Sequence, residues 1–218
     1  MANETYTLGL SLLDFVPNLA FLVGAIYLVR WTWLASQPVP QHARAQLGVV
    51  TMVAGSSLVV VGGTSKAIWK LLVTLGVGDV WLLGELQFML LAPGFLAMLV
   101  SVILTFTAQR SQGDAAWLAM APWKIPLLAT MTVSSLGLQG LLSYLAFRRK
   151  ARLAGATYVV AILCTLSLAG LAGGEQSIAR QWIEEGINAA GQIAFALGSY
   201  WLYVRFAADR NAARVAHG

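Results

Sequence analysis

Six long apolar segments follow one another with only short polar linkers between them, and this pattern constrains the fold most. A helix that crosses a bilayer needs about 20 mostly apolar residues, and because lipid offers no hydrogen-bond partners, such segments cross as α-helices. We therefore predict an all-α, polytopic integral membrane protein with one transmembrane domain over residues 1–218. Its six transmembrane helices are expected at Leu10–Ala35, Leu47–Leu75, Val80–Phe106, Pro122–Phe147, Leu153–Gly173 and Gln181–Phe206.

Composition supports the same class. Only 11% of the residues are charged, against about 25% in soluble domains, and the mean hydropathy is +0.72. The net charge of +5 does not indicate nucleic-acid binding, because Lys and Arg lie at the ends of apolar segments. The first residues, MANETYTLGL, lack the basic region of a signal peptide. We expect the first helix to be retained, in a prokaryotic inner membrane or a plasma membrane.

Basic residues predict which side each linker faces. The strongest runs are expected in the cytoplasm under the positive-inside rule, and they are Arg148, Arg149, Lys150 and Arg152, and Arg205, Arg210 and Arg214. Six crossings then place both termini in the cytoplasm, but they leave Arg30, Arg44 and Arg110 outside. A rival interpretation keeps those three inside by making Ala115–Val133 a re-entrant hairpin, with the N-terminus outside.

The chain also suggests a doubled plan, with halves at 1–110 and 115–218. Each half has a proline-bearing helix, then a helix rich in small residues, then a helix with acidic residues near its start. On a six-helix path the two halves would be inverted relative to each other, which is a common arrangement in transporters.

The last apolar segment carries a polar stripe. At about 100° per residue, one face holds Gln181, Glu184, Glu185, Asn188, Gln192 and Ser199, and the opposite face holds Ile183, Ile187, Ala190, Ala194, Leu197 and Trp201. An ionised carboxylate facing lipid costs roughly 2.5 kcal/mol or more. We therefore expect the polar face to point toward other helices or water.

A first charged cluster is expected on the cytoplasmic side and consists of Asp14, Lys66, Lys70 and Glu85. Asn18 shares a face with Asp14, and Pro17 kinks the helix between them. Charges of opposite sign in lipid favour each other's ionised form, so this cluster predicts a gate or a binding pocket. The alternative is that the lysines extend to the headgroups and Glu85 complements the positive end of its helix.

A second cluster is expected on the outer side and consists of Lys124, Arg180, Glu184 and Glu185. Glu184 is our main functional candidate, although it could simply pair with Arg180 four residues earlier. Asn188 and Gln192 lie deeper and would line a solute path. Alternatively, these amides would only bond neighbouring helices, each worth roughly 0.6–2 kcal/mol.

Missing residue types exclude several functions. The two histidines, His42 and His217, lie outside the apolar segments, and Cys164 is the only cysteine. We therefore predict no metal, no cofactor and no catalytic residues, although membrane-enzyme activity stays open. Two functions remain: a transporter or channel-like protein for a small solute or ion, or a non-catalytic subunit, sensor or scaffold that binds other membrane proteins. The expected partners are the lipid bilayer, the small solute, and another copy or a partner subunit.

Overall fold

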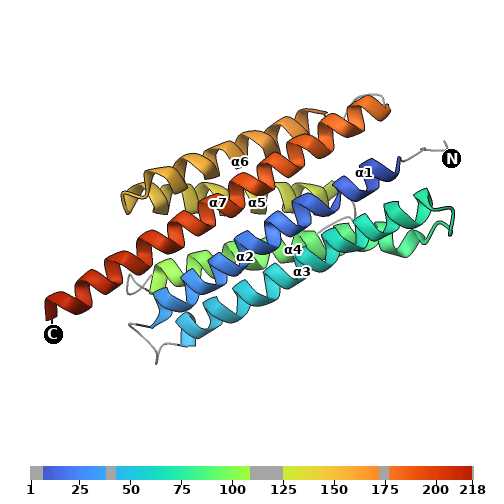
Figure 1. The fold of residues 1–218 in the computed structure, drawn as a ribbon. Coiled ribbons are helices and arrows are strands. Elements are labelled where there is room, and N and C mark those ends of the chain that lie inside the picture. The colour runs from blue at the N-terminus through green and yellow to red at the C-terminus, as the bar shows by residue number, and fades with distance from the viewer. Residues whose placement is uncertain (1–6, 38–42, 109–124, 172–176, 218) are drawn as a thin grey trace.

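The protein is a bundle of long helices in the computed structural model, which describes residues 7–37, 43–108, 125–171 and 177–217 (Figure 1). These residues contain no strand, so the predicted all-α class is confirmed. The helices are α1 (Leu8–Leu13), α2 (Phe15–Ser36), α3 (Ala43–Thr74), α4 (Trp81–Ala108), α5 (Ile125–Arg148), α6 (Arg152–Leu171) and α7 (Ile178–His217).

The helix positions follow the predicted segments closely, with two differences. The first segment is broken at Asp14 into α1 and α2. Thr7 is the N-cap of α1, and its hydroxyl accepts a hydrogen bond from the Leu10 N–H. The last segment is much longer than predicted, because α7 continues to His217 as a 40-residue helix. Its C-terminal turns are polar, so a search for apolar runs could not detect them.

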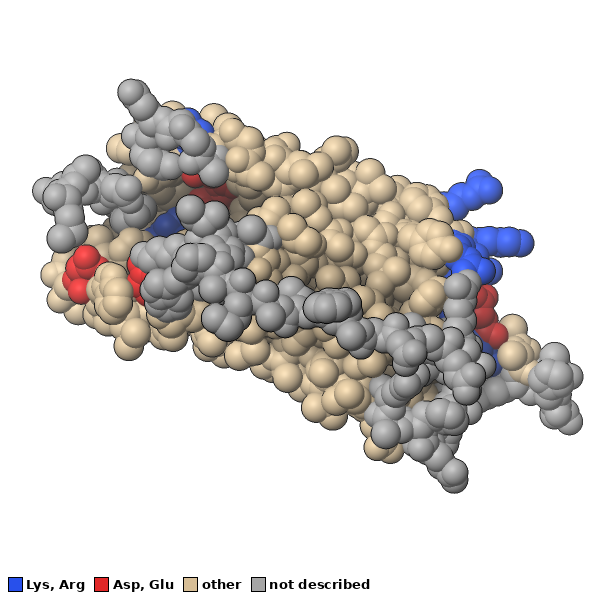
Figure 2. Space-filling view, turned by 180° about the vertical axis from the view of Figure 1, so that it is seen from behind, with Lys and Arg blue, Asp and Glu red and all other residues tan. Residues whose placement is uncertain are grey.

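Four helices among the described residues are long and apolar enough to cross a bilayer, rather than the six predicted. They are Leu8–Ser36, Ala45–Thr74, Trp81–Phe106 and Arg152–Leu171. Figure 2 shows charged side chains at the two ends of the bundle, with other residue types between them. An apolar belt between charged ends is typical of a membrane protein.

The directions of the helices follow from their contacts. Ser11 meets Thr74, so α3 runs back along the first helical segment, and Gly48 meets Ser101, so α4 runs back along α3. In the second half, α6 runs back along α5, with Ser143 bonded to Gly155, and α7 runs back along α6, with Tyr158 bonded to Ser199.

The two halves meet through α7, which runs in the same direction as α2. The Tyr27 ring lies 5.1 Å from that of Tyr200, and farther along Arg210 donates to the Leu34 carbonyl. Consequently α2, α4, α5 and α7 share one direction and α3 and α6 the other. The halves α2–α4 and α5–α7 therefore have the same orientation among the described helices, so the predicted inverted arrangement is not confirmed.

The predicted placement of both termini at one end is not supported either, because α1 begins at one end of the bundle and α7 finishes at the other (Figure 1). The rival interpretation had anticipated opposite ends. Its hairpin lies partly outside the described residues, while residues 125–133 belong to the continuous helix α5.

Glycines form the seam between α3 and α4. Gly48, Gly55 and Gly62 are seven residues apart and all face α4. A Cβ atom at Gly55 would lie 2.6 Å from the Gly94 carbonyl oxygen and 2.9 Å from the Met98 side chain. Small residues let helix backbones approach closely in membranes. The glycines at this spacing therefore allow α3 and α4 to pack in close contact along their length.

Opposite ends of the bundle should label from opposite sides of the membrane. We expect Val77→Cys, in the α3–α4 turn, to react from one side on a Cys164→Ser background. Lys150→Cys, in the α5–α6 turn, should react from the other side. The measurement is labelling with an impermeant thiol reagent in right-side-out and inverted vesicles. Labelling of both sites from one side would restore the alternating six-helix path.

Candidate functional site

Three buried charged side chains meet near the end of the bundle where α1 begins. Lys70 Nζ lies 2.7 Å from Asp14 Oδ2 and 2.7 Å from Glu185 Oε1, so one ammonium group bridges two carboxylates. Each of these side chains is less than a tenth exposed, with 7% for Lys70, 3% for Asp14 and 8% for Glu185. Asp14, Lys70 and Glu185 are called the ion cluster below.

The local structure explains why these side chains converge. Asp14 occupies the break between α1 and α2, and the hydroxyls of Ser11 and Thr74, 2.6 Å apart, hold α1 against α3. Lys70 lies one turn before the end of α3, and Glu185 lies two turns into α7. Lys66 Nζ, in a side chain 34% exposed, lies 3.6 Å from Glu185 Oε1. With Lys66 included the formal charges cancel, which reduces the cost of burying them.

Hydrogen bonding within the ion cluster is incomplete. Lys70 donates to Glu185 Oε1, and its Nζ lies equally close to Asp14 Oδ2. Within the described residues, Asp14 Oδ1 and Glu185 Oε2 are buried acceptors without a hydrogen-bond partner. Unsatisfied buried acceptors are costly, and in a membrane protein buried ionisable groups are commonly functional.

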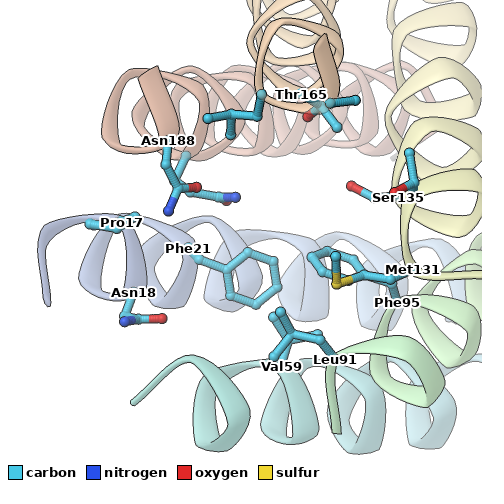
Figure 3. A pocket seen from close by; sticks show the side chains of 14 residues that line it. Pro17, Asn18, Phe21, Val59, Leu91, Phe95, Met131, Ser135, Thr165 and Asn188 are labelled. Carbon is cyan, nitrogen blue, oxygen red and sulfur yellow. The ribbon is translucent and has the colours of Figure 1, made fainter. Parts of the chain in front are cut away.

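A central cavity of about 300 Å³ lies beside the ion cluster. All six helices from α2 to α7 contribute to its wall, so it lies on the axis of the bundle rather than between two neighbours (Figure 3). Its polar lining residues are Asn18, Thr132, Ser135, Thr165, Asn188 and Gln192.

Two asparagines connect the cavity to the ion cluster. Asn18 lies one turn after Asp14 and donates from Nδ2 to the Asp14 carbonyl oxygen at 2.8 Å. Asn188 lies one turn after Glu185 and points from α7 toward α2 in Figure 3. Each carboxylate of the ion cluster therefore lies one helical turn from a residue of the cavity wall.

Gln139 organises the hydroxyls on the opposite wall. Its Nε2 donates to Ser135 Oγ at 3.1 Å and to Thr165 Oγ1 at 3.5 Å. Thr165 donates its own hydroxyl to the Ala161 carbonyl. Ser135 therefore lines the cavity with a hydroxyl that Gln139 holds in place.

Aromatic rings close the cavity on the side away from the ion cluster. Phe21 of α2 stacks on Phe195 of α7, with ring centroids 5.3 Å apart, and meets Phe95 of α4 edge-on at 5.8 Å. Phe195 also meets the ring of the fully buried Tyr158. This aromatic layer joins the two halves, as the Lys70–Glu185 ion pair does at the other end.

The structure brings together most of the predicted site residues. Asp14, Lys66 and Lys70 meet as expected, and they are joined by Glu185 of α7, which the sequence had placed in the second cluster. The predicted separation of the two clusters on opposite sides is therefore wrong, because α7 runs parallel to α2. Lys124, assigned to the second cluster, lies outside the described residues.

Glu184 occupies a different place from its neighbour. Its Oε1 accepts from Arg180 Nε at 3.0 Å within one turn of α7, and both side chains are about a fifth exposed. We expect Glu184→Gln to cost only about 0.3–0.5 kcal/mol of unfolding free energy, the usual value for such a pair. Thermal denaturation in detergent would measure this. A loss as large as that of Glu185→Gln would show that Glu184 is not a surface pair.

The polar stripe on α7 faces inward as predicted. Glu185 and Ser199 are buried, and Asn188 and Gln192 reach the cavity. On the opposite face Ile183 and Leu197 are exposed, at 55% and 46%, whereas Ala194 is buried against the core. The small Ala194 lies at the edge of the predicted outer face.

Sequence reasoning did not select three contributors: Glu185, Ser135 and Phe21. Glu185 was in the predicted stripe and the second cluster, but its spacing of three and seven residues from Asn188 and Gln192 is as helical as the four and eight of Glu184, so periodicity does not separate the two. Ser135 and Phe21 have no such signal, because a hydroxyl or ring in an apolar helix is common.

Comparisons with protein-family models, with curated proteins and with solved structures give no match. Within the described residues, no group of three or more His, Cys, Asp and Glu side chains could hold a metal ion. The fold and the site define the chain as a helical membrane bundle with a polar central cavity and a buried ion cluster.

Proposed function

We propose that the protein transports a small solute through the central cavity, with the ion cluster as the gate at one end. The observation that carries this proposal is a cavity lined by every helix from α2 to α7 and adjoining three buried charges. Transporters commonly bind solute where their repeats meet, near the middle of the membrane.

The contacts between the halves support two gates. At one end, Lys70 of the first half is bonded to Glu185 of the second. On the side of the cavity away from the ion cluster, Phe21 of the first half stacks on Phe195 of the second. Rocking of one half against the other opens the ionic contact or the aromatic contact, and exposes the cavity to one side at a time.

The sidedness of the transporter follows from its basic residues. Arg148, Lys150 and Arg152 lie at the α5–α6 turn, at the end of the bundle where α7 finishes. Arg30, toward the end of α2, lies on the same side as this turn because α2 and α5 run in one direction. We therefore place this end in the cytoplasm and the ion cluster toward the opposite side.

A bound solute should depend on the amide in the cavity wall. We expect the purified wild-type protein to retain a small molecule that Gln192→Leu loses or binds at least tenfold more weakly, because the amide is replaced by an apolar group of similar size. Mass spectrometry of the extracted small molecules would detect it. Uptake of that compound into proteoliposomes then tests transport directly.

The matched control is Leu197→Gln, which adds an amide on the exposed face of the same helix. This variant should keep the retained molecule. Equal retention by wild type, Gln192→Leu and Leu197→Gln, or absence of uptake, would contradict transport through this cavity.

The second candidate is a non-catalytic membrane subunit or scaffold. One observation favours it: the last turns of α7 project beyond the other helices in Figure 1, and Asn211, Ala212 and Ala213 are exposed. Such a projecting helix end could bind a partner subunit. Truncation after Arg210 should then release a co-purifying protein without affecting the retained small molecule.

A further inference from the structure

The wall of the central cavity indicates which chemical class of solute it accepts. The described lining residues carry amides, hydroxyls and apolar side chains, and none of them is ionisable. The nearest charges, Asp14, Lys70 and Glu185, are already bonded to one another. A charged solute would lose its hydration without gaining a counter-charge, which is strongly unfavourable in a buried site.

The polar groups are arranged to hold one edge of a solute. Asn188 and Gln192 on α7 offer both amide donors and amide oxygens. Across the cavity, Ser135 accepts from Gln139, and the Ser135 and Thr132 hydroxyls line the wall. A site with donors and acceptors on facing walls suits a neutral solute that has both.

The remaining walls are apolar and flat. The Phe21 and Phe95 rings meet edge to face, and Val59, Leu91 and Met131 lie beside them. The volume of about 300 Å³ is at the small end of the range of about 300–1,000 Å³ for ligand pockets. This space fits a small molecule with one apolar face and one hydrogen-bonding edge.

We propose that the cavity selects small, uncharged solutes that carry both hydrogen-bond donors and acceptors and one apolar face, such as neutral carboxamides. This inference rests on the proposed function and names its substrate class. It places discrimination between neutral and charged solutes in the cavity wall, and leaves the ion cluster to control access.

The test compares probes of equal size that differ in charge. Nicotinamide and nicotinate share one ring, and benzamide and benzamidinium share another. We expect millimolar nicotinamide and benzamide to raise the melting temperature of the detergent-purified protein, and their charged counterparts to produce less than a third of that shift. Ser135→Ala should reduce the nicotinamide shift at least threefold. Ser167→Ala removes an exposed hydroxyl that donates to the Leu163 carbonyl within α6 and does not line the cavity, so it should leave the shift unchanged.

Two results would overturn the inference. A nicotinate shift as large as that of nicotinamide, and equally lost in Ser135→Ala, would show that the cavity binds solute but does not select against charge. No shift with either neutral probe would show that this class is not bound. Neither result decides transport, which depends on proteoliposome uptake of the retained molecule.

Discussion

Lys70→Met is expected to lower the free energy of unfolding by about 3–5 kcal/mol, the usual cost of removing one partner from a buried ion pair. The substitution leaves Asp14 and Glu185 buried without the ammonium group that lies 2.7 Å from each. The two carboxylates lie no more than twice that distance apart, so their repulsion adds to the loss. Denaturation in detergent, followed by tryptophan fluorescence, would measure the change.

Two further variants make this prediction specific to the ion cluster. Lys66→Met removes a lysine that is a third exposed and 3.6 Å from Glu185, and should cost less than about 1 kcal/mol. The triple variant Asp14→Asn, Lys70→Met, Glu185→Gln removes all three charges and should regain most of the lost stability. Equal losses for Lys70→Met and Lys66→Met would mean that Lys70 is not the buried bridge.

Gly55→Leu is the second large effect that we expect, because it should separate α3 from α4. A Cβ at this position would already lie 2.6 Å from the Gly94 carbonyl oxygen, which belongs to backbone and cannot rotate away. Overpacking typically costs about 1–3 kcal/mol, and a clash with backbone belongs at the upper end of that range. The yield of monodisperse protein and its melting temperature would both report the change.

The matched control for this glycine is Gly140→Ala on α5. Within the described residues, a Cβ at Gly140 meets no heavy atom within 4 Å. Alanine in a helix interior is favoured over glycine by about 0.5–1 kcal/mol, so this variant should be at least as stable as wild type. If Gly55→Leu were tolerated as well as Gly140→Ala, the glycine spacing would not determine the α3–α4 contact.

The sequence predicted the helices well because each depends on a local property, the length of an apolar run. The inward face of α7 was also predictable, since it follows from the periodicity of Glu185, Asn188, Gln192 and Ser199. Both signals are contained within one segment. Neither needs information about which helix lies next to which.

The relative direction of the halves could not be predicted in this way. Assigning alternate directions to successive segments placed Lys70 and Glu185 on opposite sides of the membrane, although they are bonded in the structure. Direction is set by packing between distant helices, such as α2 on α7, and apolar periodicity does not encode it. The buried contact of Glu185 was missed for a related reason, since its partner Lys70 belongs to another helix.

The length of α7 has a mechanical consequence. One unbroken helix touches the ion cluster at Glu185, the cavity at Asn188 and Gln192, and the far end of α2 through Arg210. Glu185 and Arg210 are about 37 Å apart along it, at 1.5 Å per residue. A rigid rod of that length, tilted by about 5° around its midpoint, moves its two ends by about 1.6 Å in opposite directions. A tilt of α7 that loosens the contacts of Glu185 at one end would therefore tighten those of Arg210 at the other.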